Sequence, residues 1–149
     1  MTRVDFSALD AAGLNLQAVF RLAALPGEVA AALDPEGRHR RLILIGHGGR
    51  TLWERVKAAG LATEHPIDEF TRARVAEWLA AQLPGVAHEL VYPGDTPVGL
   101  QALGRLAGWH HESPFRVGVN ADWGSWFAYR AVLLVDADLP ESVPQAGAS

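Results

Sequence analysis

Two short apolar runs constrain the fold of this chain more than any other feature. Residues 42 to 45 read Leu-Ile-Leu-Ile, and an aromatic and aliphatic run extends from Trp126 to Leu134. Apolar runs of this length, bounded by turn residues, are typical of strands that are buried on both faces. A sheet of such strands has to be covered by other elements, so we expect an α/β domain in which helices flank the sheet.

The composition limits both the size and the chemistry of the protein. With 149 residues, 49% of them hydrophobic, the chain is long enough for one domain. A formal net charge of −4 argues against nucleic-acid binding. The sequence contains no cysteine, which excludes disulfides, thiolate zinc sites and cysteine-ligated iron-sulphur clusters.

The ends of the sequence give further expectations about location and order. The first residues lack the pattern of a signal peptide, and no apolar run approaches the length of about eighteen residues that a membrane span needs. We therefore expect a cytoplasmic protein that does not enter a membrane. We expect one domain over residues 1–140, with N-terminal helices over 1–40 and a core over 41–140, and a flexible tail over 141–149.

Apolar spacing and turn residues predict the individual elements. Residues 7–33 suggest two helices separated by Pro26-Gly27, because their apolar residues recur at helical spacing. The further expected elements are helices over 52–59, 66–83 and 98–107 and a strand over 86–92.

A glycine-rich turn, Gly46-His47-Gly48-Gly49, follows the first apolar run and precedes a helix. It lacks the Gly-Lys-Ser/Thr of a P-loop and the glycine spacing of a dinucleotide-binding turn. It is either a plain tight turn or, with His47, part of the mouth of a ligand pocket at the end of a strand.

Several ordered segments carry a resemblance to a known superfamily. They are Gly108-Trp109, the Asn-x-x-x-Gly-Ser-Trp-Phe run over 120–127, the exit over 133–140, and the upstream segments 65–68 and 92–101. Together they resemble the cobalamin-binding core shared by epoxyqueuosine reductases, corrinoid reductive dehalogenases and cblC-type cobalamin-processing proteins. The resemblance covers roughly residues 42 to 140 and implies a mixed, largely antiparallel sheet with a nitroreductase-like core.

The resemblance also implies how cobalamin would be held. Proteins of these families bind the cofactor with its base off and without a cobalt ligand from the protein, and this chain likewise lacks the Asp-x-His-x-x-Gly motif. Flat apolar walls and small residues suit such a pocket. The cofactor-binding residues expected on this basis are Trp109, His110, Gly118, Trp123, Gly124, Ser125 and Trp126.

We expect no metal site in the protein itself. His110, His111 and Glu112 are adjacent, and neighbours on an extended chain point in opposite directions. They also lack the four-residue spacing of a chelating histidine pair on a helix. Without iron-sulphur clusters, any electrons have to come from an external ferredoxin, flavoprotein or thiol.

Arg130 lies inside the second apolar run, where a guanidinium has to find a partner or a pocket opening. The cblC-type proteins have an arginine after a similar Trp-Phe-Ala-x, where it helps to hold the carboxylate of a thiol co-substrate. The resemblance therefore makes Arg130 a binding residue. The structural alternative is a buried ion pair with Asp136 or Asp138.

Three further residues have both a structural and a functional interpretation. Asp68 lies in the first turn of a predicted helix, where acids are favourable, but the resemblance puts it with His65 at a pocket rim. Asp95 precedes Thr96-Pro97 and could cap the next helix. In epoxyqueuosine reductases a proton-donating aspartate precedes a similar segment, so Asp95 is the expected catalytic residue.

The sequence thus predicts a cobalamin-binding protein that carries the cofactor or assists its reduction or dealkylation. Two other classes stay open: a flavin-dependent reductase that uses FMN, and a cofactor-free module that contacts a ferredoxin or a corrinoid enzyme. Each class is compatible with an enzyme or with a carrier, and with a homodimer.

Overall fold

The structure, a computed structural model, describes residues 3–60, 63–93, 111–112, 118–119 and 127–141. Its helices are α1 (Ser7–Ala11), the 3-10 helix η1 (Leu22–Ala24), α2 (Gly27–Leu33), α3 (Thr51–Ala59) and α4 (Pro66–Gln82). Its strands are β1 (Leu16–Arg21), β2 (Arg41–Gly48), β3 (His88–Tyr92), β4 (His111–Glu112), β5 (Gly118–Val119) and β6 (Phe127–Val135).

Four strands form one antiparallel sheet in the order β1-β2-β6-β3. The two apolar runs become its central strands, β2 and β6, which pair from Arg41 opposite Val135 to Gly48 opposite Phe127. Leu42 to Ile45 and Ala131 to Val135 are completely buried. The expected α/β class and the double burial of the first run are confirmed, and β4 and β5 form a separate two-stranded pair.

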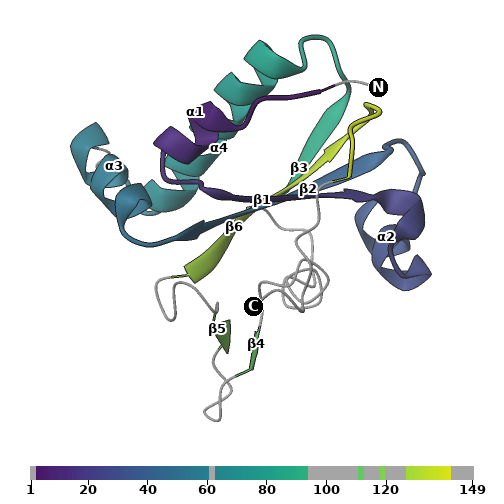
Figure 1. Cartoon of the computed structure of the whole chain (residues 1–149), viewed down its shortest axis with the longest axis horizontal. Coiled ribbons are helices and arrows are strands. Elements are labelled where there is room, and N and C mark those ends of the chain that lie inside the picture. Colours follow the sequence, from purple (N-terminus) through teal and green to yellow (C-terminus); the bar gives the residue numbers. More distant parts are fainter. Residues whose placement is uncertain (1–2, 61–62, 94–110, 113–117, 120–126, 142–149) are drawn as a thin grey trace.

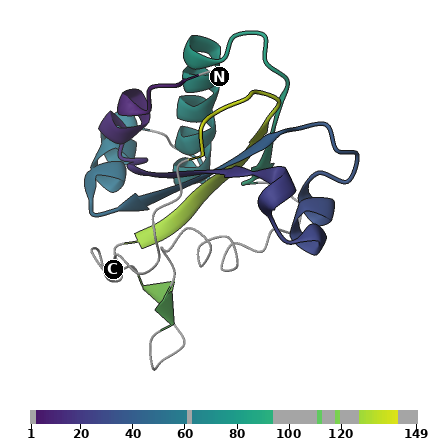
Figure 2. The ribbon, with the colours of Figure 1, turned by 45° about the vertical axis from the view of Figure 1, so that its right-hand side comes forward.

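The two faces of the sheet are covered by different helices. Figures 1 and 2 show α1, α3 and α4 over one face and α2 on the other. Alternate residues of the central strands serve the two layers: Ile43, Ile45 and Leu133 pack in the core under α4. Leu42, Leu44 and Leu134 pack in the core under α2. A strand whose two faces both pack in a hydrophobic core has no polar side, which explains the unbroken apolar runs in the sequence.

Helix α4 is the longest helix of the first layer. It begins at Pro66, as predicted, and buries Phe70, Val75, Trp78 and Leu79. The ring of Trp78 stacks on Phe6 at 5.2 Å between centroids, and its Nε1–H donates to the carbonyl oxygen of Asp5 at 2.7 Å. The buried indole therefore has its hydrogen bond satisfied while it packs the N-terminal segment onto the helix.

The prediction of two helices over residues 7–33 was wrong for its central part. Residues 16–21 form β1, which pairs with β2 from Leu16 opposite Gly46 to Arg21 opposite Arg41. Gly13 separates α1 from this strand with φ of 94°, and a Cβ atom there would lie 2.3 Å from the backbone nitrogen of Leu52. The chain passes so close to α3 that only glycine fits at position 13. Residues 16–21 then pair with the edge of β2, and this pairing favours a strand although their apolar spacing also suits a helix.

Other predicted elements agree with the structure. Helix α4 covers the expected span, and β3 lies within the strand expected over 86–92. The turn expected over 46–49 was wrong for its first part, because β2 continues to Gly48 through its pairing with β6, and only a bend at residues 49–50 leads into α3. The helix expected over 98–107 lies outside the described residues. The domain limits and the tail over 141–149 stay predictions.

Candidate functional site

Two irregularities interrupt the sheet close together, at the end where β2 and β3 finish and β6 begins. We call this the site end. Between β2 and β6 the pairing passes from Ile45–Ala131 to Gly46–Tyr129, so Arg130 has no opposite residue. Between β3 and β6 it passes from Leu90–Leu133 to Tyr92–Val132. Such bulges bend a strand and redirect a side chain, and they are over-represented beside binding sites.

Arg130 is the residue that the first bulge redirects. Its side chain is half-buried, and its Nε–H donates to the Nδ1 atom of His47 at 3.0 Å. Within the described part of the chain, this is the only hydrogen bond of the guanidinium. The Nη groups are therefore donors that can bind an acceptor brought by a ligand.

His47 presents a neutral ring to this cation. Burial, and secondly the charge of Arg130, lower the pKa of His47 from 6.5 to about 4. Because Nδ1 accepts the hydrogen bond from Arg130, the proton of the neutral ring is on Nε2. His47 thus orients the guanidinium without neutralising its charge, as a carboxylate would.

Acidic groups nearby offset only part of the cost of burying this charge. Burial lowers the pKa of Arg130, whereas the electrostatic influence of Tyr92 and Asp68 acts in the opposite direction. Asp68 lies in the first turn of α4 and Tyr92 ends β3, so two separate elements contribute. The site end therefore keeps a positive group at the surface of the core, suited to carboxylate, phosphate or carbonyl oxygens.

Side-chain contacts to the backbone hold the neighbouring strand ends. The Asn15 amide group donates to the carbonyl of Gly48 at 3.0 Å, and its oxygen accepts from the Gly48 amide at 2.9 Å. Arg72 of α4 donates to the carbonyl of Pro93, just after β3, at 3.0 Å. These bonds fix the ends of β2 and β3 on both sides of Arg130.

The structure overturns the ion-pair alternative for Arg130. Asp136 pairs with Arg40 at 3.0 Å, and Asp138 pairs with Arg41 at 2.7 Å. Both pairs lie at the far end of the sheet, where β2 begins and β6 ends. Each aspartate expected as a partner is therefore already engaged with another arginine.

Only some of the other predicted site residues lie within the ranges that the structure describes. Asp68 is brought to the surroundings of Arg130, while His65 is exposed just before α4 and makes no capping hydrogen bond. The residues outside the described ranges are Asp95, Trp109, His110, Trp123, Gly124, Ser125 and Trp126. Gly118 begins the two-residue strand β5. The binding roles assigned to all of these residues stay predictions.

The sequence did not predict that Tyr92 belongs to the site, and it did not predict the bulge that redirects Arg130. Tyr92 was expected as a strand residue and as the start of the segment over 92–101, but not as a neighbour of Arg130, because an isolated tyrosine gives no signal of a nearby arginine. The bulge at Arg130 could not be foreseen, because it exists only in the pairing of β6 with β2. Among the described residues, no group of three or more metal-ligating side chains could hold a metal ion.

The chain matches no protein-family model and no curated protein sequence. Among solved structures, it is similar to the B12-trafficking protein CblC of C. elegans, a homologue of human MMACHC. The TM-score is 0.50 at 15% sequence identity, over 87% of this chain and 68% of that one. At this identity the likeness establishes a shared fold.

No helix in the described residues has the length and apolar character needed to cross a membrane.

Proposed function

We propose that this protein binds cobalamin in a base-off form and either carries the cofactor or assists its reduction or dealkylation. The shared fold with a B12-trafficking protein supports cobalamin handling in general terms. The observation that carries the finer proposal is Arg130, a half-buried cation whose Nη groups donate to none of the described residues. Burying a charged donor in a core strand costs free energy unless an acceptor, such as one from a ligand, pairs with it.

The residues at the site end fit the chemistry of the cofactor. The corrin ring is surrounded by carboxamide groups, and its nucleotide tail carries a phosphate, so cobalamin brings acceptors that the Nη groups can bind. The neutral ring of His47 holds the Nε side of the guanidinium and leaves its charge available. When bound, cobalamin would supply a cobalt ion that changes oxidation state and exchanges an alkyl group.

Arg130 has a second suitable acceptor, the carboxylate of a thiol co-substrate. A contact of Arg130 with the cofactor and a contact with the thiol predict different effects of losing Arg130. A cofactor contact predicts that loss of Arg130 weakens cobalamin binding itself. A thiol contact predicts that cobalamin binding survives and that only thiol-dependent dealkylation is lost. In both cases His47 is a positioning residue, because it acts through the guanidinium.

The experiment is a visible-light titration of the full chain with hydroxocobalamin and with chemically reduced cobalamin. Wild type is compared with Arg130→Gln, with Trp126→Ala and with the control Arg40→Gln. The control removes the same charge at the far end of the sheet, where Arg40 is an exposed residue. A saturable shift toward the base-off spectrum is expected for wild type and Arg40→Gln.

Arg130→Gln should weaken cobalamin binding by about ten- to a hundredfold, because charge-assisted hydrogen bonds are lost. If binding is retained but glutathione-dependent dealkylation disappears, the thiol assignment replaces the cofactor assignment. No spectral change with either oxidation state would reject cobalamin altogether. A yellow, FMN-containing preparation would then support the flavin reductase, and capture of a ferredoxin by cofactor-free protein would support the interaction module.

A further inference from the structure

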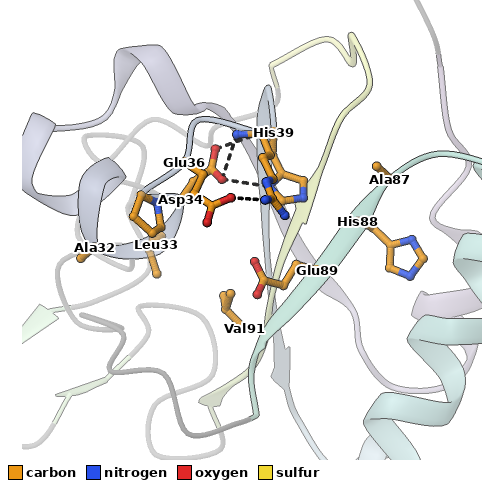
Figure 3. A pocket seen from close by; sticks show the side chains of 11 residues that line it. Ala32, Leu33, Asp34, Glu36, His39, Ala87, His88, Glu89 and Val91 are labelled. Atoms are coloured by element: carbon orange, nitrogen blue, oxygen red, sulfur yellow. Dashed lines mark hydrogen bonds and ion pairs between the residues drawn. The ribbon is translucent and has the colours of Figure 1, made fainter.

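A cavity lies on the α2 side of the sheet, away from the site end. It has a volume of about 540 Å³ and opens between the start of β3 and the loop that joins α2 to β2 (Figure 3). This size is within the range of small-molecule sites. The proposed function does not use this cavity, and its lining contains a buried, ordered polar pair.

That pair is Asp34 and His39, whose side chains are only 7% and 8% exposed. The Asp34 carboxylate accepts the backbone N–H groups of Arg38 and His39 at 3.1 and 3.0 Å, and it lies 3.0 Å from Nδ1 of the His39 ring. Burial raises the pKa of Asp34, but the hydrogen bonds from His39 and Arg38 and the charge of a protonated His39 together outweigh it and leave this pKa below its usual value. The carboxylate is therefore ionised and fixes both the loop and the ring.

This arrangement determines what the imidazole can offer to a ligand. An ionised carboxylate can only accept, so the proton of the neutral ring is on Nδ1 and Nε2 carries a lone pair. Among the described residues, Nε2 makes no hydrogen bond. His39 lines the cavity, so a buried and oriented acceptor is available there.

Glu89 adds an unpaired negative charge from the opposite wall. It lies on β3 across from the loop; His88 also contributes to the lining, but its ring points to the other side of the strand (Figure 3). Within the described residues Glu89 forms neither a hydrogen bond nor an ion pair. The remaining charges are Asp34, held as above, and Glu36, which pairs with Arg38. Three carboxylates thus face one guanidinium, and the lining remains negative even when His39 is protonated.

We propose that this cavity binds a protonated alkyl amine, independently of the cobalamin proposal. Its ammonium N–H groups donate to the Glu89 carboxylate and to Nε2 of His39, and its hydrocarbon part packs against Leu33 and Val91. An anion is disfavoured because it would face the same carboxylates. The shared chemistry is a primary ammonium, from either a free amine or a lysine side chain of another protein.

The proposal is tested by NMR titration of the full chain with n-butylammonium, and with butanoate as the matched anion. The amine should produce saturable shifts at the amides of the α2–β2 loop and the start of β3, in the millimolar range expected for so small a ligand. The Nε2 nitrogen signal of His39 should move, while that of His88 stays. Shifts that do not saturate, or equal effects of butanoate, would overturn the proposal.

Glu89→Gln supplies the critical comparison, because the substitution keeps the shape of an exposed side chain and removes no hydrogen bond or ion pair with the described residues. It should weaken amine binding about tenfold. Glu69→Gln, with the same charge change on α4, should leave binding unchanged. Equal affinities of the two variants would also overturn the proposal.

A second titration with an acetylated and amidated lysine peptide distinguishes the two sources of the ammonium group. Tighter binding of the peptide than of n-butylammonium assigns the cavity to a basic protein segment. Binding of n-butylammonium with exclusion of the peptide assigns it to a free amine. If neither probe binds, the Asp34–His39 pair only closes the loop and the proposal fails.

Discussion

Arg41 and Arg130 occupy the two central strands of one sheet, near opposite ends, and their surroundings differ. Arg41 is 12% exposed and donates to the Leu139 carbonyl at 2.7 Å, to the Arg40 carbonyl at 3.2 Å and to Asp138 at 2.7 Å. Arg130 donates to a neutral histidine at 3.0 Å and, among the described residues, to nothing else. The first arginine has its donors satisfied by its own chain, whereas the Nη groups of the second have no acceptor among the described residues.

The pairing of the strands shows the same contrast. At Arg41 the register of β1, β2 and β6 is regular, whereas a bulge leaves Arg130 without an opposite residue. A regular ladder with complete hydrogen bonds contributes stability, and an interrupted ladder with a charged donor gives some of it up. We infer that stability and binding are divided between the two ends of one sheet.

The largest effect is expected from acid. Because His47 has a pKa of 6.5 when unfolded and about 4 when folded, the unfolded chain binds more protons between these values. The contribution of this group to stability is therefore complete above pH 6.5 and is lost as the pH falls toward 4. The loss amounts to at most about 3 kcal/mol, and urea unfolding across this pH range would measure it.

His47→Gln is the control, since a glutamine oxygen can still accept from Arg130 but does not titrate in this range. Its unfolding free energy should fall less steeply between pH 6.5 and 4 than that of wild type. The lowered pKa of Asp34 affects stability only below its ordinary value of 3.8, outside this window. Identical slopes for wild type and His47→Gln would show that folding does not lower the pKa of His47.

The next largest effect is expected from replacing Arg41 or Arg130 by methionine, because the two substitutions should change the free energy of unfolding by different amounts. Arg41→Met should lower the free energy of unfolding by about 2 kcal/mol, because a buried carbonyl loses its donor and Asp138 loses its partner. Arg130→Met should change it by less than about 1 kcal/mol or raise it, because burying the cation is itself costly. Denaturant unfolding of both variants tests this. If Arg130→Met were the more destabilised, the assignment of the two roles would be reversed.

The smallest effect concerns the exposed charges beside Arg41. Asp136→Asn removes the partner of Arg40, but the two side chains are 44% and 58% exposed. Solvent screens such a pair, so the free energy of unfolding should change by less than about 0.5 kcal/mol. A thermal melt at low and at high salt would detect a larger value, which would mean that the whole far end acts as one charge network.

Much of the architecture followed from local patterns. The run over 42–45 predicted a strand buried on both faces, and Pro66 with the apolar residues after it predicted α4. The same reasoning failed over 16–21, because the apolar residues there suit either a helix or a strand. The choice depended on a free edge of β2 and on the close approach of Gly13 to Leu52.

The sequence by itself determined the two apolar strands, the absence of cysteine chemistry, and the presence of a charged residue, Arg130, inside a core strand. The tertiary structure alone decided which partners that residue has. Asp136 and Asp138 are near Arg130 in sequence, yet β6 carries them to the far end of the sheet, to Arg40 and Arg41. His47, distant in sequence, arrives beside Arg130 because β2 runs antiparallel to β6. The pairing of strands that are distant in sequence sets these distances, and the pattern within one strand does not show which strand it will pair with.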